Sequence, residues 1–169
     1  MAYITESRRD NGFFPNFSIA QNMAISRSLK DGGYKGAMGL FHEVDEQRTA
    51  ENQRELLALK CHSINQNITE LSGGNQQKVL ISKWLCCCPE VIIFDEPTRG
   101  IDVGAKAEIY KVMRQLADDG KVILMVSSEL PEIITVCDRI AVFCEGRLTQ
   151  ILTNRDDMSE EEIMAGLYH

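Results

Sequence analysis

The sequence predicts an α/β protein with a parallel sheet flanked by helices, and three observations lead to this fold class. Two short runs, "VIIF" at 91–94 and "VILMV" at 122–126, are apolar at every position. Strands that are apolar on both faces are typical of parallel sheets that are covered on both sides. Between the two runs lies a segment with apolar residues at helical spacing, and this strand–helix–strand order is typical of parallel sheets with crossover connections.

The first half of the chain predicts one strand and then mostly helices, with charged residues on their solvent faces. A glycine-rich stretch interrupts these helices, and Pro89 ends the last of them. The expected elements are a strand at 2–5, a helix at 18–29, a loop at 30–39, a helix at 43–60 and a helix from about residue 72 to 88.

The second half predicts the remaining sheet and its crossover helices. The helix at 103–117 has Ile109, Val112, Met113 and Leu116 on one face. Two apolar segments flank a Glu-Gly pair, which predicts a hairpin at the sheet edge. The expected elements are strands at 91–94 and 122–126, helices at 103–117 and 130–137, a hairpin around Glu145-Gly146 and a helix at 159–167.

Composition limits the classes of function. The formal charge of −7 argues against a nucleic-acid-binding groove, which needs clustered Lys and Arg. No apolar run approaches the roughly 18 residues of a membrane span, and the N-terminus lacks a secretory signal, so we expect a cytoplasmic chain. The six cysteines lack zinc-ligand spacing and are expected to be reduced side chains.

Two adjacent carboxylates follow the first apolar strand. Asp95 and Glu96 stand at its carboxyl end, where ligands bind in open α/β sheets. Neighbouring residues of an extended chain point to different sides, so one carboxylate can hold Mg²⁺ while the other orients or deprotonates water. The alternative is an acidic strand end at an ordinary surface turn.

The stretch "LSGGNQQ" at 71–77 places Ser72 and two glycines at the start of a helix. Gly73 and Gly74 let backbone amides approach an anion, and the helix N-terminus favours negative charge. A serine N-cap followed by flexible glycines is the alternative explanation.

Together these motifs resemble a known family. "LSGGNQQKVLISKWLCCCPEVIIFDEPTRGID" resembles the signature motif, Walker B strand and D-loop of ATP-binding-cassette (ABC) ATPases. "LSGGNQQK" with "DEPTRGIDVGAK" is similar to the second nucleotide-binding domain of the tandem sugar-import ATPases for ribose, arabinose, galactose and xylose. The resemblance implies a P-loop NTPase fold with a helical signature subdomain.

The resemblance also implies roles for the signature residues. In the family this loop reaches across a head-to-tail pair of domains and contacts the γ-phosphate of ATP bound by the other domain. The positions that match it, or adjoin it, are Ser72, Gly73, Gly74, Asn75 and Gln76. Asn75 stands where most cassettes have glutamine.

The carboxylates acquire roles in the same way. Asp95 matches the aspartate that holds Mg²⁺, and Glu96 matches the general base. Asp102 matches the D-loop aspartate, which couples the two nucleotide sites.

Three departures from the family pattern are visible. Ser128 occupies the position of the switch histidine, and serine cannot supply an imidazole. Glu6 occupies the Q-loop position, where a neutral amide is usual. The 169 residues contain no G-x-x-x-x-G-K-[ST] loop, so we expect an incomplete ABC ATPase domain without the P-loop strand, inactive alone.

This resemblance predicts three parts: a Q-loop strand and turn at 1–12, the helical signature subdomain at 13–88 and the α/β part at 89–169. Without a P-loop strand, the strands at 122–126 and 139–144 are expected to flank a gap or to pair directly. Buried unpaired strand edges are unfavourable, so self-association of the chain is a further expectation.

The predicted function is that of an ATP-binding subunit of a carbohydrate ABC importer, with ATP and Mg²⁺ as cofactors. The expected partners are another nucleotide-binding domain, permease subunits and, indirectly, a periplasmic sugar-binding protein, with no nucleic acid. The chain would then lie at the inner face of a bacterial membrane. A non-catalytic interaction fragment and a soluble ABC ATPase outside transport remain as alternatives.

Overall fold

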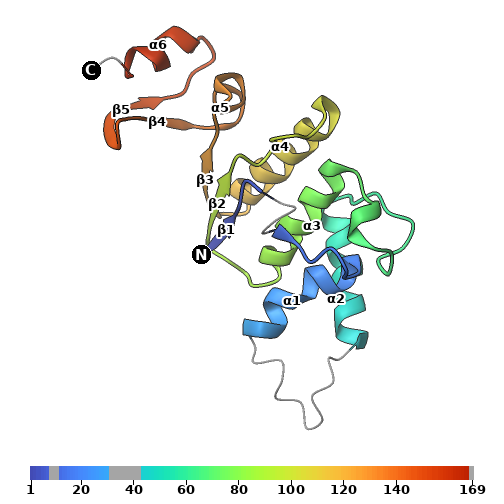
Figure 1. Cartoon of the computed structure of the whole chain (residues 1–169). Helices are drawn as coiled ribbons and strands as arrows, with labels where there is room; N and C mark the ends of the chain where they lie inside the picture. Colours follow the sequence, from blue (N-terminus) through green and yellow to red (C-terminus); the bar gives the residue numbers. More distant parts are fainter. Residues whose placement is uncertain (8–11, 31–42, 168–169) are drawn as a thin grey trace. The chain divides into compact units, whose positions relative to one another are not determined.

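The computed structural model describes residues 1–7, 12–30 and 43–167. Contacts between residues divide the chain into two compact units, Met1–Val126 and Ser127–His169 (Figure 1). Each unit has a hydrophobic core of its own. The three-part division expected from the sequence stays a prediction, and the loop expected at 30–39 lies, apart from residue 30, outside the described residues.

The first unit contains the expected elements in the expected order, with one short 3-10 helix that was not predicted. Its elements are β1 (Ala2–Ile4), α1 (Ile19–Lys30), α2 (Glu43–Leu56), the 3-10 helix η2 (Ile68–Glu70), α3 (Gly73–Leu85), β2 (Val91–Asp95), α4 (Val103–Asp118) and β3 (Val122–Val126). Helix α2 ends four residues before the predicted boundary. The reason is a left-handed residue, Ala58 with φ 46°, after which the amide of Leu59 donates back to the carbonyl of Arg54 at 2.9 Å.

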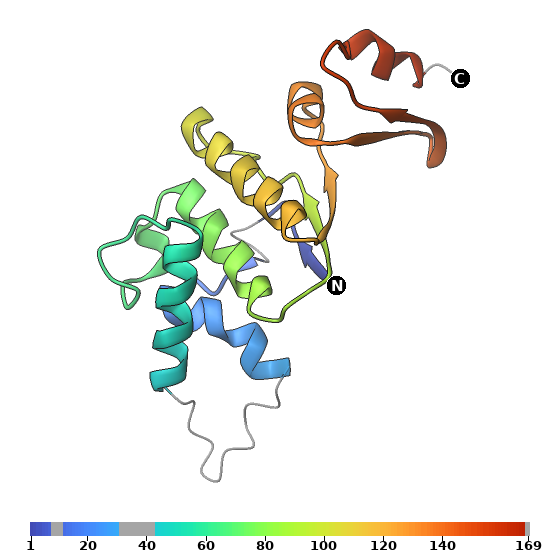
Figure 2. The ribbon, with the colours of Figure 1, turned by 180° about the vertical axis from the view of Figure 1, so that it is seen from behind.

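The three strands form a parallel sheet in the order β1-β2-β3, which confirms the predicted fold class. In the register, Ile92 of β2 stands between Ala2 of β1 and Ile123 of β3. Helices α3 and α4 lie side by side, and α3 contacts β1 while α4 contacts β3 (Figure 2). The crossover α4 therefore joins two neighbouring parallel strands.

The two faces of this sheet differ in burial. Ile4, Ile92 and Phe94 are at most 1% exposed, whereas Leu124 and its neighbours on β3 remain about half exposed. The exposed apolar side chains of β3 are Val122, Leu124 and Val126. The prediction that 122–126 is buried on both faces is therefore wrong, because the described helices of this unit cover one face of the strand only.

Helices α1, α2 and α3 lie together in the first unit (Figure 1). A second cluster of apolar side chains joins them. Its fully buried members include Ile19, Met23, Ile68 and Val79. The buried side chain of Asn22 holds the segment that precedes α1, because its Oδ1 accepts from the amide of Phe14 and its Nδ2 donates to the carbonyls of Phe14, Phe17 and Ser18. Helix α3 is therefore packed through Val79 into the cluster that it shares with α1 and α2.

The second unit contains α5 (Leu130–Val136), β4 (Arg139–Cys144), β5 (Arg147–Thr153) and α6 (Glu160–Ala165). The predicted hairpin is confirmed, and Glu145 and Gly146 form its turn with φ values of 49° and 77°. The predicted place of this hairpin at the edge of the parallel sheet is wrong, because β4 and β5 form a separate two-stranded sheet. Their core side chains pack against α5 and α6 instead.

Of the two alternatives expected for the strands at 122–126 and 139–144, a gap or direct pairing, direct pairing does not occur, because β3 and β4 belong to different sheets. Within the described part of the chain, β3 pairs with β2 alone. Helix lengths and hydropathy show no helix among the described residues that could cross a membrane.

Candidate functional site: the signature-like loop and the strand-end carboxylates

The loop before α3 presents its polar groups at a helix start. Ser72 is the N-cap of α3, with extended backbone (φ −61°, ψ 157°) and an exposed side chain that makes no cap bond to its own helix. The amide of Gln76 makes the first intrahelical bond, to the carbonyl of Ser72 at 2.9 Å. The amides of the first turn therefore point out of the helix end, as an anion-binding start requires.

Gly74 is required by packing. A Cβ atom at this position would lie 2.4 Å from the Cβ of Ala105 and 3.7 Å from Ile101, so α3 and α4 approach each other here more closely than any side chain allows. This contact brings the signature-like loop next to the start of α4. The second glycine therefore has a structural reason in addition to any contact with a ligand.

Asn75 links the loop to the turn that follows α2. Its Oδ1 accepts from the amide of Lys60 at 3.0 Å, and its Nδ2 donates to the Ser72 hydroxyl oxygen at 2.9 Å. Gln76 points inward: it is 4% exposed, and its Nε2 donates to the carbonyl of Ile68. Its predicted contact with nucleotide stays a prediction.

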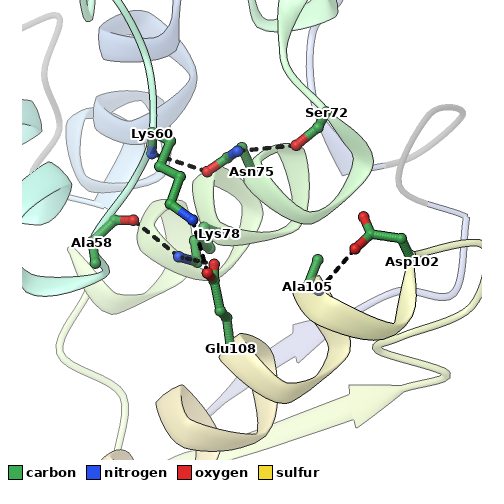
Figure 3. A network of polar contacts seen from close by, with 8 residues as sticks. All are labelled: Ala58, Lys60, Ser72, Asn75, Lys78, Asp102, Ala105 and Glu108. Atoms are coloured by element: carbon green, nitrogen blue, oxygen red, sulfur yellow. Dashed lines mark hydrogen bonds and ion pairs between the residues drawn. The ribbon is translucent and has the colours of Figure 1, made fainter.

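A charged network joins the turn after α2 to α3 and α4, next to the loop that precedes α3 (Figure 3). The carboxylate of Glu108 on α4 bridges two lysines, with 3.0 Å to Lys60 Nζ and 2.9 Å to Lys78 Nζ. Lys78 is only 3% exposed and also donates to the carbonyl of Ala58 at 3.0 Å. Hydrogen bonds from Lys78 and Lys60 lower the pKa of Glu108 to about 2.

Asp102 stands at the start of α4. Its side chain accepts from the amide of Ala105 at 2.9 Å, so it is the N-cap of this helix (Figure 3). Through Gly74 and Ala105, the structure therefore brings the helix that carries the predicted signature residues against the helix that Asp102 caps.

The two strand-end carboxylates lie at the carboxyl edge of the sheet. Asp95 ends β2, and its Oδ2 accepts from the Tyr3 hydroxyl at 2.5 Å. That hydrogen bond raises the pKa of Tyr3. Glu96 has a left-handed backbone, φ 47°, and its amide donates to the carbonyl of Val126 at 2.9 Å. Both carboxylates are partly exposed.

Glu6 follows β1 at the same edge, since β1 and β2 are parallel. It forms an ion pair with Arg99, which lies in the turn after Glu96. The negative charge of Glu6, which stands where the family usually has a neutral amide, is therefore paired with a cation. This ion pair was not predicted from the sequence.

Ser128 belongs to the second unit, where it is exposed in the turn before α5. The neighbouring hydroxyl of Ser127 donates to the buried Glu132 at 3.1 Å and accepts from the amide of Glu129. The predicted role of Ser128 as the switch position stays a prediction.

Sequence reasoning missed Lys60, Lys78 and Glu108. The signal for Lys78 was its place four residues after Gly74, on the face of α3 that packs against α4. No pattern in the sequence pairs it with Glu108, thirty residues further on. Among the described residues, no group of three or more His, Cys, Asp or Glu side chains could hold a metal ion, and all six cysteines are free.

The fold and the motif-bearing loops are those of an ATP-binding cassette. Residues 1–99, more than half of the chain, match the model of the ABC transporter family, and the chain belongs to that family. A solved structure of the cassette MJ0796, a dimeric post-hydrolysis state bound to ADP and Pi, has a TM-score of 0.71 over 91% of this chain and 63% of its own, at 22% identity.

Two relatives are named as sugar transport proteins. The chain is 99% identical over 165 residues to the D-allose import ATP-binding protein AlsA of Escherichia coli (strain K12). The matched residues make up 98% of this chain and 32% of that protein. The chain is 46% identical over 167 residues to the L-arabinose transport ATP-binding protein AraG of Geobacillus stearothermophilus, covering 97% and 31%. The chain thus spans about a third of the length of the curated relatives it matches.

Proposed function

We propose that this chain is part of a nucleotide-binding domain of a carbohydrate ABC importer, in which ATP hydrolysis drives sugar uptake. The observation that supports this most strongly is the start of α3, where the exposed Ser72 and the half-buried Gly73 precede a helix that is packed into the cluster of α1, α2 and α3. The names of the relatives support sugar import, and the 99% identity favours D-allose as the sugar.

The proposed role of the loop is to act on a nucleotide held by another domain. Ser72 donates a hydrogen bond to the γ-phosphate of ATP, and the amides of Gly73 and Gly74 add donors at the positive end of α3. Asn75 holds Ser72 in place, and Gln76 supports the loop from within the core. The chain thereby completes a site whose P-loop lies elsewhere.

The carboxylates fit the divalent cation that accompanies ATP. Mg²⁺ keeps water and phosphate ligands and needs only one or two protein carboxylates, which the partly exposed Asp95 can supply. When bound, Mg²⁺ neutralises phosphate charge. Glu96 would orient or deprotonate water as the general base, and Asp102 would couple the two nucleotide sites. Glu6 would place a charge near the phosphates at the Q-loop position. Ser128 lacks the imidazole of the switch position, so we propose that nucleotide hydrolysis by this domain is weak or absent.

The proposed partners follow from this role. They are the other nucleotide-binding domain, permease subunits and, through these, a periplasmic sugar-binding protein. The chain would lie in the cytoplasm at the inner face of a bacterial inner membrane, attached through the permease.

Association with an ATP-loaded partner tests the proposal. The chain is mixed with the two-thirds of the E. coli D-allose import relative that it does not match, and complex formation is measured by sedimentation velocity with and without MgATP. We expect MgATP to promote association and Ser72→Ala to weaken it. Equal association with and without MgATP would contradict the trans-acting role.

A second measurement concerns chemistry by the chain alone. We expect no ATP turnover, because the sequence contains no G-x-x-x-x-G-K-[ST] loop to hold the phosphates. Sustained hydrolysis by the purified chain, lost in Glu96→Gln, would overturn this part of the proposal.

A non-catalytic interaction fragment is the second candidate function. The exposed apolar side chains of Val122, Leu124 and Val126 favour it, since an apolar strand face with an unpaired edge promotes association with a second copy of the chain. This candidate keeps the dimerisation and signature surface and differs from the first in performing no chemistry alone.

A further inference from the structure

We propose that Asn75 is a positioning residue that fixes the direction of the Ser72 hydroxyl proton, so that this hydroxyl acts as a donor toward phosphate. The inference rests on the proposed function, in which Ser72 contacts a phosphate of ATP held by another domain. It deepens that function by assigning a task to the residue at which this loop departs from the usual glutamine.

The orientation of the Asn75 amide is fixed by its backbone partner. The Lys60 amide can only donate, so the Asn75 atom 3.0 Å from it must be the carbonyl oxygen Oδ1. The other end of the side chain is then the NH₂ group, which can only donate. It lies 2.9 Å from the Ser72 hydroxyl oxygen. An exchange of the two atoms would place donor against donor at Lys60.

The consequence falls on the Ser72 hydroxyl. Because its oxygen accepts from Asn75, its own hydrogen points away from Asn75 and is available to a second group. The side chain is exposed and does not cap its own helix, so no described intrahelical acceptor takes this hydrogen. Ionised phosphate oxygens are acceptors. A hydroxyl with its proton already directed outward therefore matches phosphate without reorientation.

Lys60, whose backbone amide holds Asn75, is itself held by an ion pair. Its ammonium group pairs with Glu108, and Glu108 also binds the nearly inaccessible Lys78 of α3 (Figure 3). Lys78 lies on the same helix that Ser72 caps, so the contacts run from Ser72 through Asn75, Lys60 and Glu108 back to α3. The position of the Asn75 side chain is thus determined at both ends.

Two substitutions separate this task from a packing role. Asn75→Asp has nearly the same shape and keeps the acceptor for the Lys60 amide, but its second oxygen accepts from Ser72 and turns the hydroxyl proton inward. Asn75→Ala removes both contacts and leaves the hydroxyl free to rotate. Asn75→Asp should therefore weaken MgATP-dependent association about ten- to a hundredfold, the range for a hydrogen bond to a charged group, and Asn75→Ala only a few fold. A packing role predicts the reverse order.

The added negative charge is controlled by repeating Asn75→Asp in a Ser72→Ala background. Without the hydroxyl, the substitution should weaken association less than threefold. The proposal is supported if Asn75→Asp weakens association at least ten times more when the Ser72 hydroxyl is present than when it is absent. An equal factor in both backgrounds, or a larger loss for Asn75→Ala than for Asn75→Asp, overturns it.

If MgATP fails to promote association of the wild-type chain with its partner, that result contradicts the proposed function and leaves the role of Asn75 to be tested separately. A measurement on the free chain provides that test. The side-chain NH₂ signals of Asn75 are recorded by NMR in the wild type and in Ser72→Ala. Loss of the hydroxyl should shift these signals upfield and speed their exchange with water. Unchanged signals would overturn the donor assignment, whatever the association data show.

Discussion

At the scale of single residues, the close approach of α3 and α4 makes a direct prediction. Gly74→Ala places a methyl group 2.4 Å from the Cβ of Ala105 and should destabilise the first unit by about 1–3 kcal/mol, as overpacking of a tight contact does. Ala105→Gly in the same chain should restore part of the loss, although alone it costs roughly 0.5–1 kcal/mol of helix stability. Urea denaturation of the four variants measures the coupling. Strictly additive effects would show that the two helices separate here without strain.

A second residue-scale prediction concerns acid. The pKa of Glu108 is lowered from 4.5 to about 2 in the folded chain, chiefly by the hydrogen bond from Lys78. A carboxyl with a depressed folded pKa stabilises the fold fully above its unfolded value, and this contribution declines as the pH falls from 4.5 toward 2. The stability difference between wild type and Glu108→Gln should therefore be constant from pH 7 to 5 and shrink below pH 4.5. Denaturation at pH 6, 4 and 3 checks it; a difference independent of pH would contradict it.

The places of several candidate site residues at helix and strand ends were predictable from the sequence, but most of their contacts were not. Ser72 and Asp95 lie in short motifs that mark a helix start and a strand end, whereas Asp102 was picked out by the family resemblance. The ion pair of Glu6 with Arg99 and the network around Glu108 join positions far apart in the chain. Such pairs depend on how helices and strands pack, and local periodicity contains no information about that.

At the scale of elements, α4 depends on its N-cap residue. Asp102 accepts from the Ala105 amide, and loss of an N-cap acceptor costs about 0.5–2 kcal/mol. Asp102→Ala should therefore lower the stability of the first unit by about 1 kcal/mol, whereas Asp102→Asn, also a good cap, should change it little. Equal losses in the two variants, measured by denaturation, would assign the effect to charge instead of capping. In activity assays on the longer relatives, Asp102→Asn is then the better probe of a coupling role.

Element types were predicted well, because helix and strand periodicity is local. Two of the tertiary expectations that were wrong show what local periodicity leaves open. The apolar run at 122–126 indicates a strand meant to be covered, but it does not specify what covers the face of Leu124, which the described helices leave half exposed. The turn at Glu145-Gly146 predicts a hairpin, yet which sheet a hairpin joins is decided by long-range packing, here against α5 and α6.

At the scale of the whole molecule, the exposed strand face predicts association. Leu124→Lys should reduce self-association of the chain, since it adds a charge to the centre of the apolar stripe on β3. Leu148, equally exposed on the hairpin of the second unit, provides a matched control for the same change. Sedimentation velocity over a range of concentrations measures both variants. Equal effects of the two lysines would show that net charge, not the β3 face, governs association.

The division into two units, each with its own core, determines what a spectroscopic probe reports. Two cores allow two melting transitions, so a single midpoint for the whole chain need not describe either unit. Trp84, the only tryptophan of the sequence, lies in α3 and hence in the first unit. Its fluorescence is therefore a built-in reporter for the helix that begins at the signature-like loop, and it follows the unfolding of that unit without signal from the hairpin.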